Sequence, residues 1–457
     1  MNAPFDTLAI ALPEDLRFGF APHPVSCGFG LRIGAGEVYP ELNFTLPMMS
    51  IEAATWGEVT AHYQEIAEMI VKAAKRLRLP GLVVEFELLP PMTERPEWGA
   101  DITRILSAAL WRAHEEYGLP CALRVTPTDV RDRQRPPLLR SGEEWDILCD
   151  SLERCAESGA HILSIESVGG KEVHDEALMY GDIRGAIFAL GVLAPRDMEW
   201  LWTRIVEVST RHRIVPGADS ACGFANTAMQ LASQGMLPEV LATVIRAASA
   251  VRSLIAYQCG AIGPSKDCAY EGPVIKAITG TPIAMEGKSA SCAHFSPVGN
   301  VAAAMCDLWS NESVQNVRLL SGSAPEAFLE LLAYDCRLFN EATRKHMAQQ
   351  YQSMLVSSDV GFSPQALILS PDSTLRIARA IVGQRDPYSQ TVAAARTAVE
   401  IIKHSLALEE LSISARENQW LEKIERALDS LPDKEETLLG EMAEAYGHRF
   451  SPSSYGL

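Results

Sequence analysis

Cysteine pairs of the C-x-x-C type are absent from this 457-residue chain. Its ten cysteines are scattered, at positions 27, 121, 149, 155, 222, 259, 268, 292, 306 and 336. A chain of this length does not need disulfide bonds for stability, so we expect a reducing compartment. No Lys or Arg precedes Arg17, unlike in a signal peptide, and no uninterrupted apolar run is long enough to span a bilayer. These absences predict a soluble, cytoplasmic protein.

Positive charge is also scarce. The chain has 40 Lys and Arg against 58 Asp and Glu, which gives a formal net charge of −18. Phosphate backbones and anionic membrane surfaces repel an acidic chain, so we expect neither nucleic acid nor membrane as a partner. The composition is otherwise that of a globular protein, with 47% hydrophobic residues and 21% charged residues.

Three common catalytic signatures are missing as well. The sequence contains no P-loop, no H-E-x-x-H and no G-x-S-x-G. The stretch CGFGLRIG is close to a dinucleotide-binding loop, but it does not follow a clear strand and its glycine spacing is off by one. We therefore expect an ordinary loop there.

Short apolar or β-branched runs recur along the chain, separated by stretches with helical period. The eight candidate strands are LVVEFEL from Leu82, ALRVTP from Ala122, HILSIES from His161, RIVPGAD from Arg213, LIAYQCG from Leu254, TPIAMEG from Thr281, VQNVRLLSG from Val314 and ALILSP from Ala366. Helical patterns cover residues 101–117, 143–157 and 324–350. This alternation predicts an α/β protein with a TIM (β/α)8 barrel, although a doubly wound open sheet also alternates in this way.

Two regions lie outside the alternation. Residues 1–80 contain a loop rich in Gly and Pro and then a helix at about 56–79, and we expect them to pack on the barrel. Residues 373–457 are predicted to form several helices, with charge-rich runs such as EKIERALDSLPDKEE. The predicted organisation is thus an N-terminal segment (1–80), a barrel (81–372) and a C-terminal helical extension (373–457).

Candidate metal ligands lie at the ends of three successive predicted strands. Glu166 ends the third strand, Cys222 follows the fourth and Cys268 follows the fifth. Functional residues of a TIM barrel lie at this end of the strands, so the three side chains should share one rim. Zinc accepts thiolate and carboxylate ligands, and three protein ligands leave a fourth position for substrate. Buried cysteines that only pack, with a glutamate in an ion pair, would explain the same residues.

Other residues offer rival interpretations. Cys259, in a predicted strand, and Cys292, with His294 close by, are alternative thiol ligands. Glu85 and Glu87 face the same side of the first predicted strand. They could form a carboxylate pair for acid–base chemistry, or enter an ion pair.

Five long stretches resemble one enzyme family. They are SIESVGGKEVHDEAL, GDIRGAIFALGVLAPRDMEWLW, PGADSACGFANTAMQLA, SKDCAYEGPVIKAITGTPIAMEGKSASCAH and CDLWSNESV, between about residues 160 and 315. The chain resembles the zinc-containing subunit of methanol–corrinoid protein methyltransferases, and the resemblance extends over most of its length. It implies a TIM barrel with extra helices and one zinc ion. The Glu of ESVGGKE is Glu166, the Cys of ADSACGFANT is Cys222, and the Cys of SKDCAYE is Cys268.

The resemblance also implies an activity. Methanol would occupy the fourth zinc position, and cob(I)alamin would attack the methyl carbon to give methylcob(III)alamin and water. The chain has no D-x-H-x-x-G pattern of a corrinoid-binding module, so the corrinoid should come on a partner protein. We also expect a homodimer. The proton donor is left open between Asp219, His174, Lys266 and Asp267, which are close to the ligands in sequence.

Two alternatives remain at this stage, and a third is disfavoured by the sequence. The same chemistry could act on another small methyl donor, such as a methyl ether. The chain could also be a non-catalytic homologue that binds the corrinoid protein. Zinc methyltransferases that activate a thiol and resemble uroporphyrinogen decarboxylases use an H-x-C pair, and no such pair occurs here.

Overall fold

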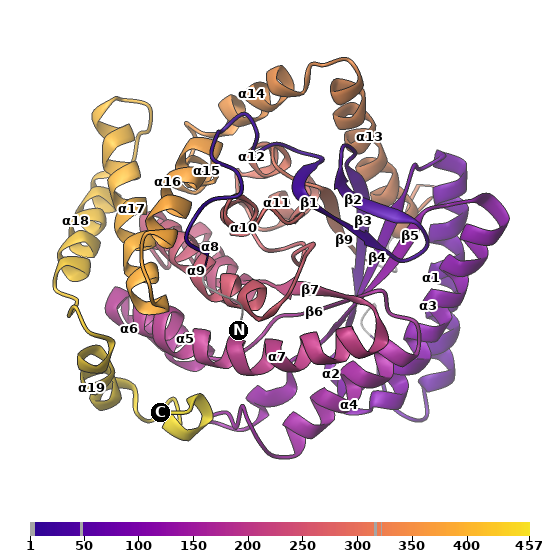
Figure 1. The fold of residues 1–457 in the computed structure, drawn as a ribbon, viewed down its shortest axis with the longest axis horizontal. Coiled ribbons are helices and arrows are strands. Elements are labelled where there is room, and N and C mark those ends of the chain that lie inside the picture. The colour runs from indigo at the N-terminus through magenta and orange to yellow at the C-terminus, as the bar shows by residue number, and fades with distance from the viewer. Residues whose placement is uncertain (1–4, 46–48, 315–317, 321) are drawn as a thin grey trace.

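A computed structural model of the protein describes residues 5–45, 49–314, 318–320 and 322–457. Its centre is a strongly curled sheet of seven strands, all parallel, in the order β7-β6-β5-β4-β3-β9-β8 (Figure 1). The strands are β3 (Tyr39–Thr45), β4 (Leu82–Leu88), β5 (Cys121–Pro127), β6 (Ile162–Ile165), β7 (Val215–Asp219), β8 (Ala284–Glu286) and β9 (Leu308–Val314). An α/β protein with a curled parallel sheet agrees with the sequence prediction.

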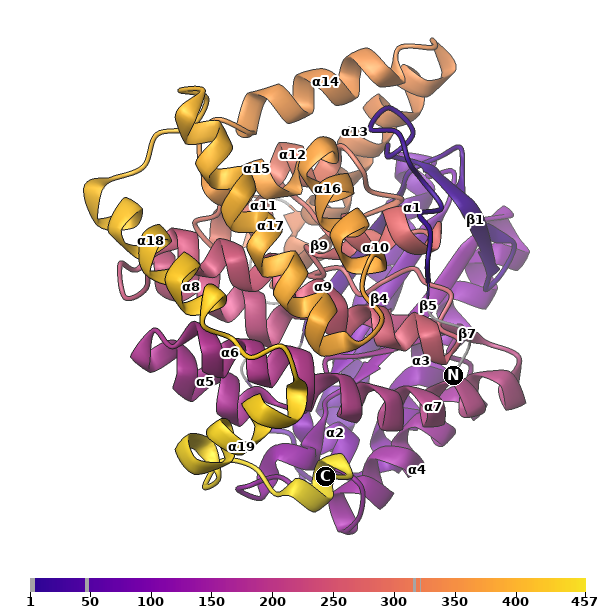
Figure 2. The same cartoon turned by 60° about the vertical axis from the view of Figure 1, so that its left-hand side comes forward.

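Helices surround the outer face of the sheet, and those of the C-terminal region pack outside them (Figures 1 and 2). The larger helices are α1 (Trp56–Leu77), α3 (Pro96–Tyr117), α4 (Glu143–Glu157), α7 (Ala194–His212), α9 (Glu239–Cys259), α13 (Ala324–Arg344), α14 (Ala348–Asp359), α16 (Pro371–Val382), α17 (Pro387–Ala407), α18 (Ala415–Asp429) and α19 (Glu435–Tyr446). The shorter helices are α2 (Pro90–Glu94), α5 (Lys171–Tyr180), α6 (Ile183–Phe188), α8 (Thr227–Ser233), α10 (Gly272–Thr279), α11 (Lys288–Ala293), α12 (Gly299–Ala303) and α15 (Pro364–Leu369).

The amphipathic pattern of α1 explains why it forms a helix on the surface of the sheet. Val59, Tyr63, Ile66 and Ile70 recur every three or four residues and are all buried. The helix ends at Arg78, whose left-handed backbone lets its N–H bond back to the last turn. The predicted helix at 56–79 is therefore confirmed to within two residues.

Helix α9 lies in the core. It is long and apolar enough to cross a membrane by length and composition, but its apolar segment is entirely buried within the molecule. It also carries Arg246 and Arg252, both with buried side chains. Burial inside the protein thus accounts for its apolar composition.

The inner face of the sheet is layered. The first layer is apolar and includes Val83, Ala122, Ile162, Ala284 and Leu308. The antiparallel hairpin of β1 (Phe20–Cys27) and β2 (Leu31–Ala35) contributes to the same apolar cluster, and no helix residue in the described part of the chain does. Alternate residues of a strand share a face, so the residues two positions further along these strands form the next layer. That second layer is polar. It consists of Glu41, Glu85, Arg124, Ser164, Glu286 and Ser310, all buried.

Two predicted strands are helical in the structure. LIAYQCG, from Leu254, is the C-terminal part of α9, and ALILSP, from Ala366, lies in α15. A short buried apolar run does not reveal its period, so strand and helix cannot be distinguished from it. The helical pattern predicted at 324–350 is divided between α13 and α14.

Two other strands differ in position. The strand predicted from Val314 falls partly on residues 315–317 and 321, outside the described residues, and the sheet strand β9 precedes it. β10 (Arg318–Leu319) and β11 (Gly322–Ser323) form a separate antiparallel pair. Strand β3 was not predicted, because YPELNFT contains Pro40 and polar residues. It nevertheless pairs with β4 and β9 at the centre of the sheet.

Candidate metal centre

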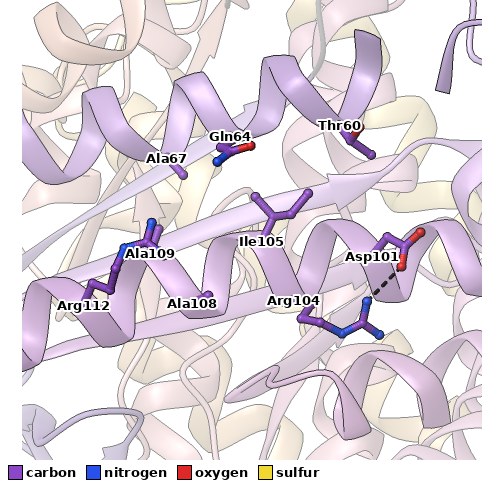
Figure 3. Close-up of a pocket in the computed structure, with 9 residues that line it drawn as sticks. All are labelled: Thr60, Gln64, Ala67, Asp101, Arg104, Ile105, Ala108, Ala109 and Arg112. Carbon is purple, nitrogen blue, oxygen red and sulfur yellow. Dashed lines mark hydrogen bonds and ion pairs between the residues drawn. The ribbon is translucent and has the colours of Figure 1, made fainter. Parts of the chain in front are cut away.

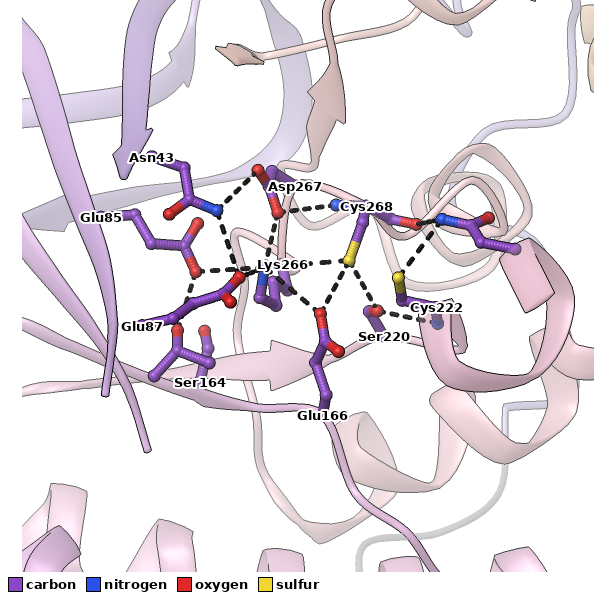
Figure 4. A network of polar contacts seen from close by, with 12 residues as sticks. Asn43, Glu85, Glu87, Ser164, Glu166, Ser220, Cys222, Lys266, Asp267 and Cys268 are labelled. Atoms are coloured by element: carbon purple, nitrogen blue, oxygen red, sulfur yellow. Dashed lines mark hydrogen bonds and ion pairs between the residues drawn. The ribbon is translucent and has the colours of Figure 1, made fainter. Parts of the chain in front are cut away.

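Three side chains meet at the carboxyl ends of the strands. Glu166 follows β6, Cys222 begins the helical segment η3 (Cys222–Asn226) after β7, and Cys268 lies in the loop before α10. Their ligand atoms all lie within 4.8 Å of one another (Figure 4). The Glu166 Oε1 atom is 3.0 Å from the Cys268 Sγ atom. The structure thus brings together the three residues that the sequence placed on one rim.

Polar groups surround the two sulfur atoms. Asn226 Nδ2 donates to Cys222 Sγ at 3.3 Å, and Ser220 Oγ lies 3.1 Å from Cys268 Sγ. The Ser220 hydroxyl also accepts a hydrogen bond from the Cys222 N–H at 3.0 Å, so its own hydrogen is free to point to the sulfur of Cys268. Such outer contacts orient thiolate ligands.

Without a cation, the pKa values of the three acidic groups are raised. Burial raises the pKa of the Cys268 thiol well above its ordinary value, and burial likewise raises the pKa of Glu166. A hydrogen bond with Cys268 lowers the pKa of Cys222, but burial and the charge of Glu166 outweigh it, and the pKa rises to about 11. A bound divalent cation would offset this crowding of buried acids. The donor set therefore fits a metal ion.

Lys266 sits beside this group, wholly buried. Its Nζ atom lies 2.6 Å from Glu87, 2.8 Å from Asp267, 3.4 Å from Glu166 and 3.5 Å from Glu85 (Figure 4). Burial acts to lower the pKa of Lys266, but the surrounding negative groups, Asp267 first, raise it well above its ordinary value. The ammonium group is thus charged. Of the two interpretations of Glu85 and Glu87, the structure favours ion pairing.

Asp267 joins Lys266 to the candidate ligand Cys268. Its Oδ1 atom accepts from the Cys268 N–H at 2.8 Å, and its Oδ2 atom accepts from Asn43 at 3.2 Å and from Ser310 at 3.0 Å. Burial acts to raise the pKa of Asp267, and Lys266 outweighs it, so the pKa is lowered. Asp267 is an anion that fixes the backbone at Cys268.

Asp219 is engaged by other groups. Its Oδ1 atom accepts from the backbone N–H of Ser220 at 2.8 Å, from that of Ser167 at 3.4 Å and from Arg252 at 3.0 Å. Its Oδ2 atom accepts from Trp202 Nε1 at 3.1 Å. These contacts tie the loop after β6 to the loop after β7, which favours a positioning role for Asp219.

His174 lies apart from the acids around Lys266. It is buried on α5, and its ring packs edge-on against Phe224 at 5.0 Å. Burial lowers the pKa of His174. Lys266 and Asp267 are therefore the two candidate proton donors with contacts to the proposed ligands.

The rival ligands lie elsewhere. Cys259 is on α9, where its thiol faces the Glu199 carbonyl at 3.8 Å, and Cys292 is exposed on α11. Among the described residues, neither belongs to a group that could hold a metal ion. His294 lies 3.6 Å from Glu286 at the end of β8. Sequence reasoning missed Glu286, although the strand-end rule applied to TPIAMEG would have found it.

A cavity of about 330 Å³ opens beside Glu166. It is lined by Glu87, Pro90, Thr126, Pro127, Thr128, Asp129, Asp132, Glu166, Ser167, Val168, Lys171 and Gly223. Another cavity, of about 360 Å³, lies between α1 and α3, where Arg104 and Asp101 form an ion pair at 2.9 Å (Figure 3). Of these two cavities, the first reaches the candidate metal centre, since Glu166 lines it.

Comparison with known proteins identifies the family. Residues 2–456 match the family described as methanol-cobalamin methyltransferase B subunit (MtaB). The chain is 35% identical to a methanol–corrinoid protein co-methyltransferase of Methanosarcina barkeri (strain Fusaro / DSM 804), over 99% of both chains. It is similar to a chain in the crystal structure of the methanol:cobalamin methyltransferase complex MtaBC from Methanosarcina barkeri, with a TM-score of 0.95, 34% identity and complete coverage of both chains. The chain therefore belongs to the family of methanol-cobalamin methyltransferase B subunits.

Proposed function

We propose that this chain transfers the methyl group of methanol to the cob(I)alamin of a separate corrinoid protein. The observation that carries the proposal is the meeting of Glu166, Cys222 and Cys268 at the mouth of the curled sheet. The family match over residues 2–456 supports it. The net reaction consumes methanol, cob(I)alamin and a proton, and it yields methylcob(III)alamin and water.

Glu166, Cys222 and Cys268 would hold a zinc ion, since two thiolates and a carboxylate are a donor set that zinc accepts. When bound, zinc supplies a Lewis acid that makes the hydroxyl of methanol a better leaving group. The three ligands carry one more negative charge than the ion carries positive charge. The neighbouring Asp267 adds to the negative charge and Lys266 offsets part of it. The residues thus favour the neutral alcohol over its anion.

The cavity beside Glu166 would admit the alcohol. Its volume of about 330 Å³ exceeds the need of a one-carbon substrate, so the opening also leaves room for a second reactant. A nucleophile displaces an oxygen leaving group from the opposite side of the carbon. The methyl group must therefore face the opening, and the cobalt must approach from there.

The corrinoid would be carried by a partner protein that docks at this mouth. The solved relative was crystallised as the complex MtaBC. In the present chain, Phe295 is 80% exposed in the loop after α11. An aromatic side chain exposed at the strand-end side of the sheet is a natural contact for a docked protein. We further propose a homodimer and a cytoplasmic location.

The proton that completes the reaction would come from one of the four candidates, Asp219, His174, Lys266 or Asp267. Lys266 and Asp267 have contacts to Cys268, at 3.8 Å from Lys266 Nζ to the sulfur and at 2.8 Å from the Asp267 carboxylate to the backbone N–H. General acid catalysis by a positioned group contributes about 10²–10⁴-fold to a rate. Of these two, Lys266 is favoured, because its ammonium group carries protons while Asp267 is an anion.

Two alternatives share this geometry, namely another methyl donor and a non-catalytic homologue. The test is optical assay of cobalamin methylation with methanol, methoxybenzoates and methylamines offered in turn, together with metal analysis. Methanol should be the best donor, because its oxygen can reach the metal while a quaternary amine has no lone pair to offer. Faster reaction of a methoxybenzoate would refute the substrate proposal, and absence of stoichiometric zinc would favour the non-catalytic alternative.

We also propose that the curled sheet is a closed (β/α)8 barrel. The segment between α9 and α10 would take the remaining position between β7 and β8. In its support, the backbone N–H groups of Ile262 and Gly263 donate to β7 carbonyls at 3.0 and 2.9 Å. Arg124 of β5 reaches across the interior to the Pro264 carbonyl at 2.9 Å. Residues 81–372 would form most of this barrel, and β3 adds one strand from within residues 1–80. The rest of 1–80 and residues 373–457 would pack on the barrel.

A further inference from the structure

The loop that carries Glu166 is held by groups from three distant parts of the chain. It runs from Glu166 to Gly170, between β6 and α5. The N–H of Ser167 donates to Asp219 at 3.4 Å, and the N–H of Val168 donates to Asp129 at 3.0 Å. The N–H of Gly170 donates to the hydroxyl of Tyr455 at 2.9 Å. The last of these contacts comes from the C-terminal end of the chain.

The C-terminal tail, defined as residues 447–457, is docked rather than frayed. Tyr455 is only 2% exposed although two residues follow it. Its ring lies 6.2 Å from that of Phe450, which packs against Phe188 of α6 at 5.5 Å. Ser454 Oγ donates to the Pro137 carbonyl at 3.0 Å. The burial of Tyr455 and these contacts show that the tail fits a formed surface of the protein.

The loop has little freedom to move on its other side. A Cβ atom at Gly169 would lie 2.3 Å from Asp197, and Gly170 has φ of +86°, a conformation that favours glycine. Arg131 pairs with Asp197 at 2.8 Å and with Asp129 at 2.7 Å, and all three side chains are buried. The loop is thus clamped between this ion cluster and the tail.

We propose that the C-terminal tail is a positioning element of the metal centre, and that the Tyr455 hydroxyl is the contact through which it holds the Glu166 loop. The inference rests on the proposed zinc site. A metal ligand must be held within about 0.5 Å of its productive place, and loops achieve this less well than strands. Loss of an outer partner of a ligand weakens metal binding by about 10–100-fold. Tyr455 contacts Gly170, four residues from Glu166, so we expect its loss to weaken metal binding by the lower end of this range.

The test is a cobalt(II) titration of the full chain after its zinc has been removed with a chelator. Co²⁺ bound by thiolates gives visible and charge-transfer absorption bands that report ligand geometry, which a purely structural role would not alter. Tyr455→Phe keeps the ring and removes only the hydroxyl. We expect its Kd for Co²⁺ to rise about tenfold, with a changed absorption spectrum.

Tyr446→Phe is the matched control. Its hydroxyl, just before the tail, donates at 2.8 Å to Asp182, the residue that caps the start of α6, away from the loop. Both variants should lower the melting temperature to a similar degree, but Tyr446→Phe should bind Co²⁺ as the wild type does. If Tyr455→Phe has the affinity and spectrum of the wild type, the proposed role of the tail is refuted and the zinc site still stands. Equal weakening of Co²⁺ binding in both variants would have the same meaning. Failure of the wild type to bind Co²⁺ would refute the zinc site and the role of the tail together.

Discussion

Cys268 and Glu166 are 102 residues apart in sequence, and the thiol sulfur of the first lies 3.0 Å from a carboxylate oxygen of the second. Cys268 is buried and Glu166 is partly buried. Burial raises the pKa of both groups, and the charge of Glu166 raises the pKa of Cys268 further. Two acids held this close are best explained by a cation that binds both.

Removal of a thiol should release the metal. We expect Cys222→Ala and Cys268→Ala each to lose most of the zinc and the methyltransferase activity, because two remaining protein ligands do not retain zinc. Cys292→Ala is the control, since Cys292 is exposed on α11. The measurement is zinc per chain by elemental analysis after dialysis. Full zinc content in both single variants would refute the assignment of Cys222 and Cys268 as zinc ligands.

Replacement of Lys266 should cost far more stability than replacement of an exposed lysine. Lys266→Met leaves Glu85, Glu87 and Asp267 without their buried cation, and such a loss costs about 3–5 kcal/mol. Lys72 pairs with Glu68 at 3.9 Å and its side chain is 76% exposed, so Lys72→Met should change the free energy of unfolding by less than about 1 kcal/mol. Urea unfolding of both variants checks this. Equal effects of the two substitutions would show that Lys266 is not needed to neutralise the acids.

His161 should make stability depend on pH. Burial lowers the pKa of His161 to about 4, from 6.5 in the unfolded chain, and its Nδ1 atom accepts from the Leu123 N–H at 3.0 Å. Between these values the unfolded chain binds one more proton than the folded chain. The contribution is therefore intact above pH 6.5 and is lost as the pH falls to 4.

The check is urea unfolding of the wild type and of His161→Asn between pH 4 and pH 7.5. The Asn side chain offers an acceptor without a titrating group, so its free energy of unfolding should fall less on acidification. The difference should be on the order of 1–3 kcal/mol. Parallel pH dependences of the two proteins would exclude His161 as the source.

The chain alone should be inactive, and a separate corrinoid protein should restore methyl transfer. The reason is the absence of the D-x-H-x-x-G pattern from the sequence. Light scattering of the free and mixed proteins should show a homodimer that binds one corrinoid protein per chain. Stoichiometric cobalamin copurifying on this chain, or turnover with methanol in the absence of any corrinoid protein, would contradict the prediction.

The strands β4 to β7, the helix α4 and the meeting of Glu166, Cys222 and Cys268 on one rim were all predictable from sequence. Those strands have apolar runs bounded by polar turns, and Glu166 and Cys222 follow strand ends, where a parallel sheet collects its functional groups. LIAYQCG was misassigned as a strand, because an apolar run buried on all sides has no visible period. Cys268 nevertheless lies on the predicted rim, because the loop that follows α9 brings it there.

Tertiary structure decided the rest. β3 is a strand because its polar side chains enter the polar inner layer, where Glu41 meets Arg124 at 2.8 Å. Lys266 became a buried cation because Glu85, Glu87 and Asp267, from separate parts of the chain, converge on it. Tyr455 reached the Glu166 loop across 285 residues of sequence. Such contacts depend on which distant parts of the chain meet in the fold, and no local pattern of residues encodes which parts meet.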